Sequence, residues 1–158
     1  MSAAVRESAD TVGRWMSWAK ADFNAYDAAC WFDACIQARA AGTAHEFGIF
    51  AADGTFVGGC GLNQFSRINK LCNLGYWVRQ SRQSEGAATA ATRALQQLGL
   101  QRLGLARVEI VIAEDNVASV TVARKAGAHY ECLAKSRLQI HGKPTAAHVF
   151  SFTANADT

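Results

Sequence analysis

Residues 79–95, RQSRQSEGAATAATRAL, decide how the fold of this chain is interpreted. The stretch passes from polar residues through one glycine, Gly86, into an alanine-rich run with the spacing of an amphipathic helix. A glycine loop that opens a helix directs unpaired N–H groups, and about half a positive charge, toward whatever lies in front of it. Residues Gln83 to Ala88 therefore predict a site for an anion such as a phosphate.

Two common nucleotide-binding motifs are absent from this loop. The sequence lacks the G-x-x-x-x-G-K-[ST] pattern, and no further glycines complete G-x-G-x-x-G. The residues alone leave a structural alternative open, in which Gly86 lets the chain turn and the alanines pack close to a sheet.

The segments on either side of the loop predict alternating helices and strands. The Asp53-Gly54 pair indicates a tight hairpin turn, and the continuous apolar run 108–113 is typical of a central strand covered on both faces. Asn116 is expected to cap a helix that ends at Gly127, and Pro144 to lie in the last turn. The predicted helices are 8–21, 26–41, 85–103 and 117–127, and the predicted strands are 47–52, 55–62, 70–78, 108–113, 130–140 and 145–152.

Length and composition indicate one globular domain over residues 1–158. The formal charge of the chain is only +3, and the lysines and arginines are scattered along the sequence, which does not favour a nucleic-acid partner. Five cysteines without a C-x-x-C pair are typical of reduced thiols, so we expect a cytoplasmic protein. No apolar run reaches the roughly 18 residues that a membrane span needs.

Together these motifs resemble the GNAT superfamily of N-acetyltransferases, over about residues 47–152. An L-G-Y-W strand precedes the loop, Q-x-x-G-x-A opens the helix, and N-x-x-S starts the helix after the apolar strand. This combination is most similar to the branch that acetylates the N-termini of ribosomal proteins. The resemblance implies an α/β (α+β) fold of three layers, with a central mixed, mostly antiparallel sheet and helices on both faces.

The resemblance also implies acetyl-coenzyme A as cosubstrate, without a metal, and its diphosphate on the backbone of the loop. Ser119 matches the family serine that protonates the departing thiolate, although a serine at a helix start can instead cap the backbone. Trp77 is expected to line the slot for the pantetheine arm, or else to pack in the core, and Arg79 to add charge or to face solvent. The predicted cofactor-binding residues are Trp77, Val78, Arg79, Gln83, Ser84, Glu85, Gly86, Ala87, Ala88, Asn116 and Ser119.

The implied reaction is direct transfer in a ternary complex, in which an amine attacks the thioester. Asn73 stands where many family members carry an acid that helps to deprotonate this amine, and Glu131 is the only acid expected nearby. At pH 7 an unassisted deprotonation costs about 1.4 kcal/mol for an α-amine and about 4.6 kcal/mol for lysine. We therefore expect a peptide N-terminus or a small amine of low pKa as acceptor.

The front of the chain departs from the family branch, whose members usually begin with an edge strand before the first helix. We expect this chain to lack that strand, through shortening or through a start site chosen late, and dimerisation to cover the exposed edge. Trp15, Trp18 and Trp31 are expected to line the acceptor side or to serve as core aromatics. Two other functions stay open. The chain could be a module that binds an acyl-coenzyme A with little or no turnover, or a basic protein that binds nucleic acid.

Overall fold

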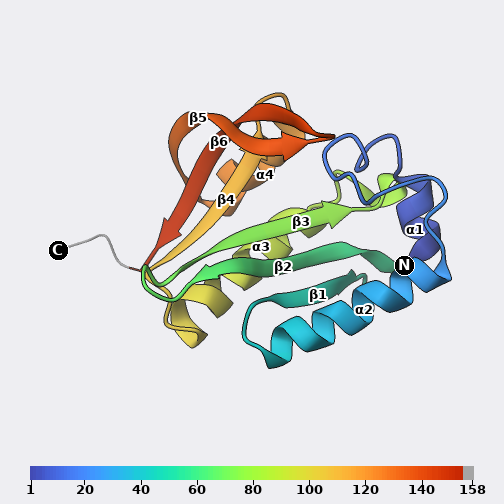
Figure 1. The fold of residues 1–158 in the computed structure, drawn as a ribbon, viewed down its shortest axis with the longest axis horizontal. Helices are drawn as coiled ribbons and strands as arrows, with labels where there is room; N and C mark the ends of the chain where they lie inside the picture. Colours follow the sequence, from blue (N-terminus) through green and yellow to red (C-terminus); the bar gives the residue numbers. More distant parts are fainter. Residues whose placement is uncertain (155–158) are drawn as a thin grey trace.

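A six-stranded sheet organises the part of the chain that the computed structural model describes, residues 1–154 (Figure 1). The strand order is β1-β2-β3-β4-β6-β5, and only β3 and β4 pair in parallel. The strands are β1 (His45–Phe50), β2 (Phe56–Ser66), β3 (Leu71–Val78), β4 (Arg107–Ala113), β5 (His129–Ile140) and β6 (Lys143–Thr153). The predicted mixed, mostly antiparallel sheet is confirmed.

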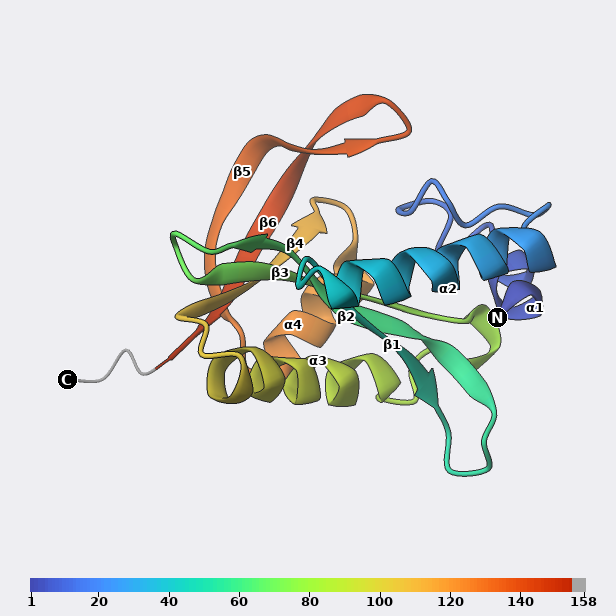
Figure 2. The same ribbon diagram turned by 60° about the horizontal axis from the view of Figure 1, so that its bottom comes forward.

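Helices cover both faces of this sheet, as predicted. Figure 2 shows α2 on one side of the first strands and α3 and α4 on the other. The helices are α1 (Ser2–Glu7), α2 (Ala25–Ala40), α3 (Ala87–Gln97) and α4 (Val117–Ala126), with a 3-10 turn η1 (Gln80–Arg82) and a π-helical turn η2 (Leu98–Arg102). The result is a three-layer arrangement.

Side-chain caps explain where α2 and α4 begin. Asn24 Oδ1 accepts hydrogen bonds from the N–H groups of Tyr26 and Asp27, while the Asp27 carboxylate accepts from Asn24 N at 2.9 Å. The predicted cap of α4 is confirmed, because Asn116 Oδ1 accepts from the N–H of Ser119 at 3.1 Å. Such caps satisfy N–H groups that have no partner within the helix.

The predicted helix over residues 8–21 is wrong. Helix α1 ends at Glu7, and turns lead from there to α2. At Gly13 the chain folds back so tightly that an added Cβ would lie 2.1 Å from the carbonyl oxygen of Ala9 and 2.4 Å from that of Ala19. The apolar spacing that suggested a helix instead serves a small cluster in which Val12, Ala19 and Phe23 are buried.

Two other boundaries differ from the prediction. The helix expected over 85–103 ends at Gln97 and continues only as the π-helical turn η2, before Gly104 at φ +65°. Pro144 lies in β6 rather than in the last turn, which His141 and Gly142 form with φ of +48° and +74°. Proline is tolerated there because β4 pairs with β6 only from Ala147 onward, so no ladder bond is lost to that strand.

The main core lies between the sheet and the pair α3 and α4. Phe150, Leu62, Leu74, Ile110 and Val108 are among its fully buried side chains. The predicted central position of β4 is confirmed, since it lies between β3 and β6. Its cover is unequal: alternate residues are buried on one face, whereas those of the other face are only half-buried.

Strands β3 and β4 part after a short shared segment. Their ladder consists of Leu71 with Arg107, Cys72 with Val108 and Asn73 with Glu109. Beyond Asn73, β3 stays paired with β2 as far as Val78, and β4 stays paired with β6. The sheet therefore opens as a fork, visible in Figure 1.

Candidate active site

The start of α3 lies beyond the end of β3 and presents its backbone outward. Gly86 is the N-cap at φ +86°, and no side chain caps the helix. Within residues 1–154, the N–H groups from Ser84 to Thr89 have no hydrogen-bond acceptor. A Cβ built on Gly86 would meet nothing within 4 Å, so the space in front of these groups is open. This arrangement suits an anion.

The charged side chains of the preceding loop are engaged within the protein. Arg79 forms a two-pronged ion pair with Glu7 of α1, and the Ser81 hydroxyl donates to the same carboxylate at 2.7 Å. Arg82 Nε contacts Glu85 Oε2 at 2.8 Å. The hydrogen bonds from Arg79 and Ser81 hold the pKa of Glu7 at about 2. Helix α1 therefore fastens the loop, while the cofactor-binding roles of Arg79 and Glu85 stay predictions.

Gln83 and Val78 contact each other across this loop, since Gln83 Nε2 donates to the Val78 carbonyl at 3.3 Å. Ser84 has a positive φ of +67°, and the small side chains of Ala87 and Ala88 follow Gly86 in the first turn of α3. The structure thus brings the predicted residues of the loop together at the tip of β3.

Ser119 lies on the other prong of the fork, in the first turn of α4. Its carbonyl oxygen accepts a hydrogen bond from Tyr76 Oη at 3.1 Å, so the two prongs are joined by this bond. Burial raises the pKa of Tyr76 to about 12, which keeps its hydroxyl protonated as a donor at neutral pH. The cap of α4 comes from Asn116 and not from the Ser119 hydroxyl. The Ser119 hydroxyl lies beside Tyr76, where a hydrogen bond partly offsets the rise in the pKa of Tyr76.

Trp77 faces α2 and belongs to an aromatic cluster. Its ring lies edge-on to Trp18 at 5.5 Å and tilted to Phe56 at 5.8 Å, and Trp18 stacks on Trp31 at 6.4 Å. Trp15 is not part of this cluster, because its ring lies under the guanidinium of Arg14. Of the three front tryptophans, two therefore join Trp77 and one does not.

This cluster walls a pocket of about 230 Å³ between α2 and the sheet, here called the α2 pocket. Two polar residues belong to its lining, Glu46 and Asn63, and they form a hydrogen-bonded chain with Asn73: Glu46 Oε1 accepts from Asn63 Nδ2 at 3.2 Å, and Asn63 Oδ1 accepts from Asn73 Nδ2 at 3.0 Å. The lining includes Trp18, Trp31, Phe32, Phe56 and Trp77, the glycines Gly48, Gly59 and Gly75, and Glu46 and Asn63.

Glu131, the acid expected near the alternative base position on the penultimate strand, is engaged in an ion pair. Glu131 is bound by Arg107 at 2.5 and 2.6 Å and by the Ser151 hydroxyl at 2.6 Å, and these hydrogen bonds lower its pKa to about 2. The carboxylate linked to Asn73 is that of Glu46. The signal for it in the sequence is an acid within a strand whose neighbouring strand is rich in glycine.

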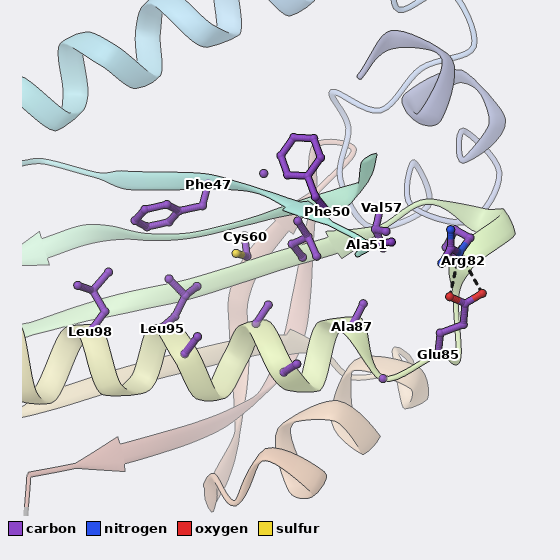
Figure 3. A pocket seen from close by; sticks show the side chains of 16 residues that line it. Phe47, Phe50, Ala51, Val57, Cys60, Arg82, Glu85, Ala87, Leu95 and Leu98 are labelled. Carbon is purple, nitrogen blue, oxygen red and sulfur yellow. Dashed lines mark hydrogen bonds and ion pairs between the residues drawn. The ribbon is translucent and has the colours of Figure 1, made fainter. Parts of the chain in front are cut away.

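A larger cavity, about 710 Å³, runs along the opposite face of the sheet between α3 and strands β1 and β2 (Figure 3). We call it the edge groove, since β1 pairs only with β2 in the described sheet. Alanines of α3 form one wall, Phe47 and Phe50 of β1 belong to the other, and Arg82 and Glu85 lie at one end. Ala91 both lines this space and packs against the main core, so the small side chains serve the groove and the packing of α3 on the sheet.

Comparison with known proteins gives the family. A model described as "Acetyltransferase (GNAT) domain" matches residues 2–129. The chain belongs to the GNAT acetyltransferase family. The resemblance stated from the motifs is thereby confirmed, and with it the prediction of an acyltransferase class.

Solved structures of this family share the fold over nearly the whole chain. A "putative ribosomal-protein-serine acetyltransferase" from Vibrio cholerae is 29% identical, with a TM-score of 0.77 over 97% of this chain and 90% of that one. Mycobacterium smegmatis RimJ, solved with a coenzyme A disulfide, is 23% identical, with a TM-score of 0.88 over 97% of this chain and 75% of that one.

Among curated proteins, the "Probable N-acetyltransferase YjcK" of Bacillus subtilis (strain 168) is 31% identical over 62% of this chain. The chain spans about half the length of the curated relatives it matches, 55% of this one and 49% of a second from the same organism. Within residues 1–154, no helix is both long and apolar enough to cross a bilayer.

Replacing Glu7 tests whether α1 fastens the loop. Because the pKa of Glu7 is lowered from 4.5 to about 2, its contacts stabilise the folded state above pH 4.5, and this contribution is lost as the pH falls toward 2. We expect Glu7→Gln to lower the denaturation midpoint at pH 7 and to differ less from the unsubstituted protein at pH 3. Denaturant titrations at both values measure this.

The control is Glu85→Gln, whose carboxylate pairs only with the nearby Arg82 and does not reach α1. Its effect is expected to be smaller. A Glu7→Gln deficit of equal size at pH 3 and pH 7 contradicts the ion-pair explanation.

Proposed function

We propose that this chain is an N-acetyltransferase that transfers the acetyl group of acetyl-coenzyme A directly to a primary amine in a ternary complex. The observation that carries the proposal is the row of unpaired N–H groups from Ser84 to Thr89, placed where β3 has parted from β4. A helix start of this kind binds a diphosphate without a metal, because nothing breaks at phosphorus.

The fork supports the placement of the pantetheine arm. Past Asn73, the edge of β3 that faces β4 has no ladder partner in residues 1–154, so its backbone amides are free to bind the amide groups of the arm. The tips of the two prongs then hold the thioester between β3 and α4. Trp77 takes part through its backbone, since its ring faces the α2 pocket.

Ser119 is proposed as the donor that protonates the departing thiolate. Its backbone is fixed by Asn116 on one side and by Tyr76 on the other, and its hydroxyl is not used to cap the helix. An ordered backbone holds such a group within reach of a reacting atom, which is what proton donation requires.

The cysteines do not favour a covalent acetyl-enzyme. Cys60 lines both the α2 pocket and the edge groove, but burial raises the pKa of its thiol to about 11. Burial also raises the pKa of Cys35, which lines the α2 pocket. Thiols of this kind are poor nucleophiles at neutral pH, which supports direct transfer. All five cysteines are free, as suits the proposed cytoplasmic location.

The acceptor is proposed to be an α-amine, on a peptide N-terminus or a small molecule. An α-amine reaches its reactive neutral form at pH 7 more easily than lysine, by about 3 kcal/mol. The Vibrio cholerae relative and the second Bacillus subtilis (strain 168) relative, YdaF, carry names of ribosomal-protein or ribosomal acetyltransferases, which fits a protein as acceptor. A homodimer that covers β1 stays a prediction. A measurement of the molar mass by light scattering checks whether the protein is a dimer.

Substitution of Gly86 tests the donor site. Gly86→Val strains the backbone at φ +86° and places a branched side chain before the free N–H groups. Loss of one or two charge-assisted hydrogen bonds weakens binding about 10-fold or more, so we expect a rise of this size in the Kd of acetyl-coenzyme A by calorimetry.

Gly104→Val is the matched control, because Gly104 also has a positive φ and open space but lies beyond the far end of α3. Equal affinities for both variants overturn the proposed donor site.

Removal of the Ser119 hydroxyl tests the proton donor. Ser119→Ala keeps both backbone hydrogen bonds, so we expect an unchanged Kd for acetyl-coenzyme A and a fall in kcat of about 100-fold. Thiol release measures kcat. Thr121→Ala, on the same helix, is the control, because the Thr121 hydroxyl only bonds to the carbonyl of Val117. A kcat equal to that of the unsubstituted protein removes Ser119 from the mechanism.

Paired peptides test the acceptor. At pH 7 we expect kcat/KM for a peptide with a free N-terminus and no lysine to exceed that for a lysine peptide with a blocked N-terminus. The reason is the larger neutral fraction of the α-amine. Comparable values refute the α-amine preference. Tight binding of acetyl-coenzyme A without thiol release for either peptide supports an acyl-coenzyme A binding module instead.

A further inference from the structure

The sheet surface beneath α2 is lined by glycines around one carboxylate. A Cβ on Gly61 would lie 1.9 Å from Glu46 Oε2, and one on Gly59 would lie 2.6 Å from Trp77 Nε1. Gly61 therefore leaves the room in which the Glu46 side chain lies flat across β2. At Gly75 an added Cβ would meet nothing within 4 Å, so the surface is open there.

Strand register brings this carboxylate next to the fork. Glu46 pairs with Gly61, and Gly61 pairs with Gly75, so the three residues form one row across β1, β2 and β3. Neighbouring strands lie about 4.8 Å apart, which places a carboxylate above Gly61 about one strand spacing from the open space at Gly75. Gly75 follows Asn73, the last residue of β3 that pairs with β4, by two positions.

The hydrogen bonds of Glu46 orient it and leave it an unused oxygen. Asn63 donates to Oε1, and Asn73 donates to Asn63. Because a carboxylate only accepts, this series of hydrogen bonds fixes the orientation of both side-chain amides. Within residues 1–154, Oε2 has no hydrogen-bond donor, and no lysine or arginine forms a salt bridge with Glu46. The pocket thus holds a carboxylate that lacks a cation.

The surroundings of Glu46 suit a primary ammonium group. The faces and edges of Trp18, Trp31 and Trp77 wall the pocket, and aromatic rings together with a carboxylate are a favourable setting for an organic cation. Burial raises the pKa of Glu46, which makes it a stronger proton acceptor than an exposed carboxylate.

Other titratable or charged groups border the pocket. Arg39 of α2 donates to the main-chain oxygen of Glu46 at 2.9 Å. The other titratable side chains that line the pocket are Cys35, Cys60 and Tyr76, and the lining also includes Met1, the first residue of the sequence.

We propose that Glu46 binds the ammonium group of the acceptor in the α2 pocket and takes a proton from it, before the amine attacks the thioester at the fork. This inference rests on the proposed function and names the base that the sequence did not reveal. The ammonium passes one proton to the Glu46 carboxylate, which releases it to solvent. The neutral nitrogen then forms a bond to the acetyl carbon, the carbon–sulfur bond breaks, and the second nitrogen proton replaces the one that Ser119 gives to the thiolate.

The test compares Glu46→Gln with the unsubstituted protein from pH 6 to pH 9.5, with acetyl-coenzyme A and a free-N-terminus peptide. Gln retains the hydrogen bond to Asn63 but cannot accept a proton. We expect kcat/KM for thiol release to fall about 100-fold at pH 7 and the deficit to shrink at high pH, where the free amine is abundant. The Kd of acetyl-coenzyme A is expected to stay unchanged, and Asp10→Asn, an exposed carboxylate, is the control.

Stability separates this role from a structural one. A buried carboxylate of raised pKa favours the folded state at low pH, and that contribution is lost as the pH rises through its folded pKa. Glu46→Gln is therefore expected to melt at the same or a higher temperature at pH 8. A deficit in kcat/KM that is equal at every pH, or none at pH 7, overturns the proposal.

A binding measurement covers the case in which the unsubstituted protein releases no thiol and the proposed function fails. With coenzyme A present, calorimetry is expected to show the peptide binding about 10-fold more weakly to Glu46→Gln than to Asp10→Asn. Such a loss keeps Glu46 as an ammonium site in a protein that is not an enzyme. Equal peptide affinities for the two variants overturn the site itself.

Discussion

The early end of the β3–β4 ladder is the constraint on which the rest of the site depends. Three residue pairs join these strands, and each then continues on its outer neighbour, β2 or β6. Beyond the ladder, the backbone groups of β3 and β4 that face each other have no partner in the described sheet. They are still held in place, because β3 remains hydrogen-bonded to β2 and β4 to β6. The bond from Tyr76 to Ser119 fixes the distance between them. A polar opening in the middle of a sheet is stable only if such groups find a ligand or water.

The sequence predicts those parts of the fold that depend on neighbours along the chain. Asp53-Gly54 forms the turn between β1 and β2, Asn116 caps α4, and Gly86 opens α3, because each of these features involves residues a few positions apart. The front segment fails for the opposite reason. The spacing of its apolar residues fits a helix, but contacts with residues far along the chain hold its path: Gln80 N–H donates to Ser8 Oγ at 2.9 Å, and His141 Nε2 lies 2.9 Å from the Gly13 carbonyl oxygen.

The candidate site divides along the same line. The loop before α3 and the first turn of α4 are readable as motifs, whereas Glu46 becomes visible only through strand register, which sets Gly61 beneath it and links it through Asn63 to Asn73. Asn73 by itself suggests a site without a base. In the structure it is instead one end of a short polar chain that leads to Glu46. The two proposed sites therefore lie apart, the anion site at the start of α3 and the ammonium site under α2.

Strand β2 has a weak intrinsic preference for the extended conformation, yet it lies between β1 and β3 and borders both cavities. Gly58, Gly59 and Gly61 give it little preference for an extended conformation and few side chains to pack, so its position is imposed by β1, β3 and the ring of Trp77. Cys60, between these glycines, separates the α2 pocket from the edge groove on the opposite face. A local loosening of this one strand therefore changes the shape of both hollows at once, and molecules lodged in either would rigidify the wall of the other.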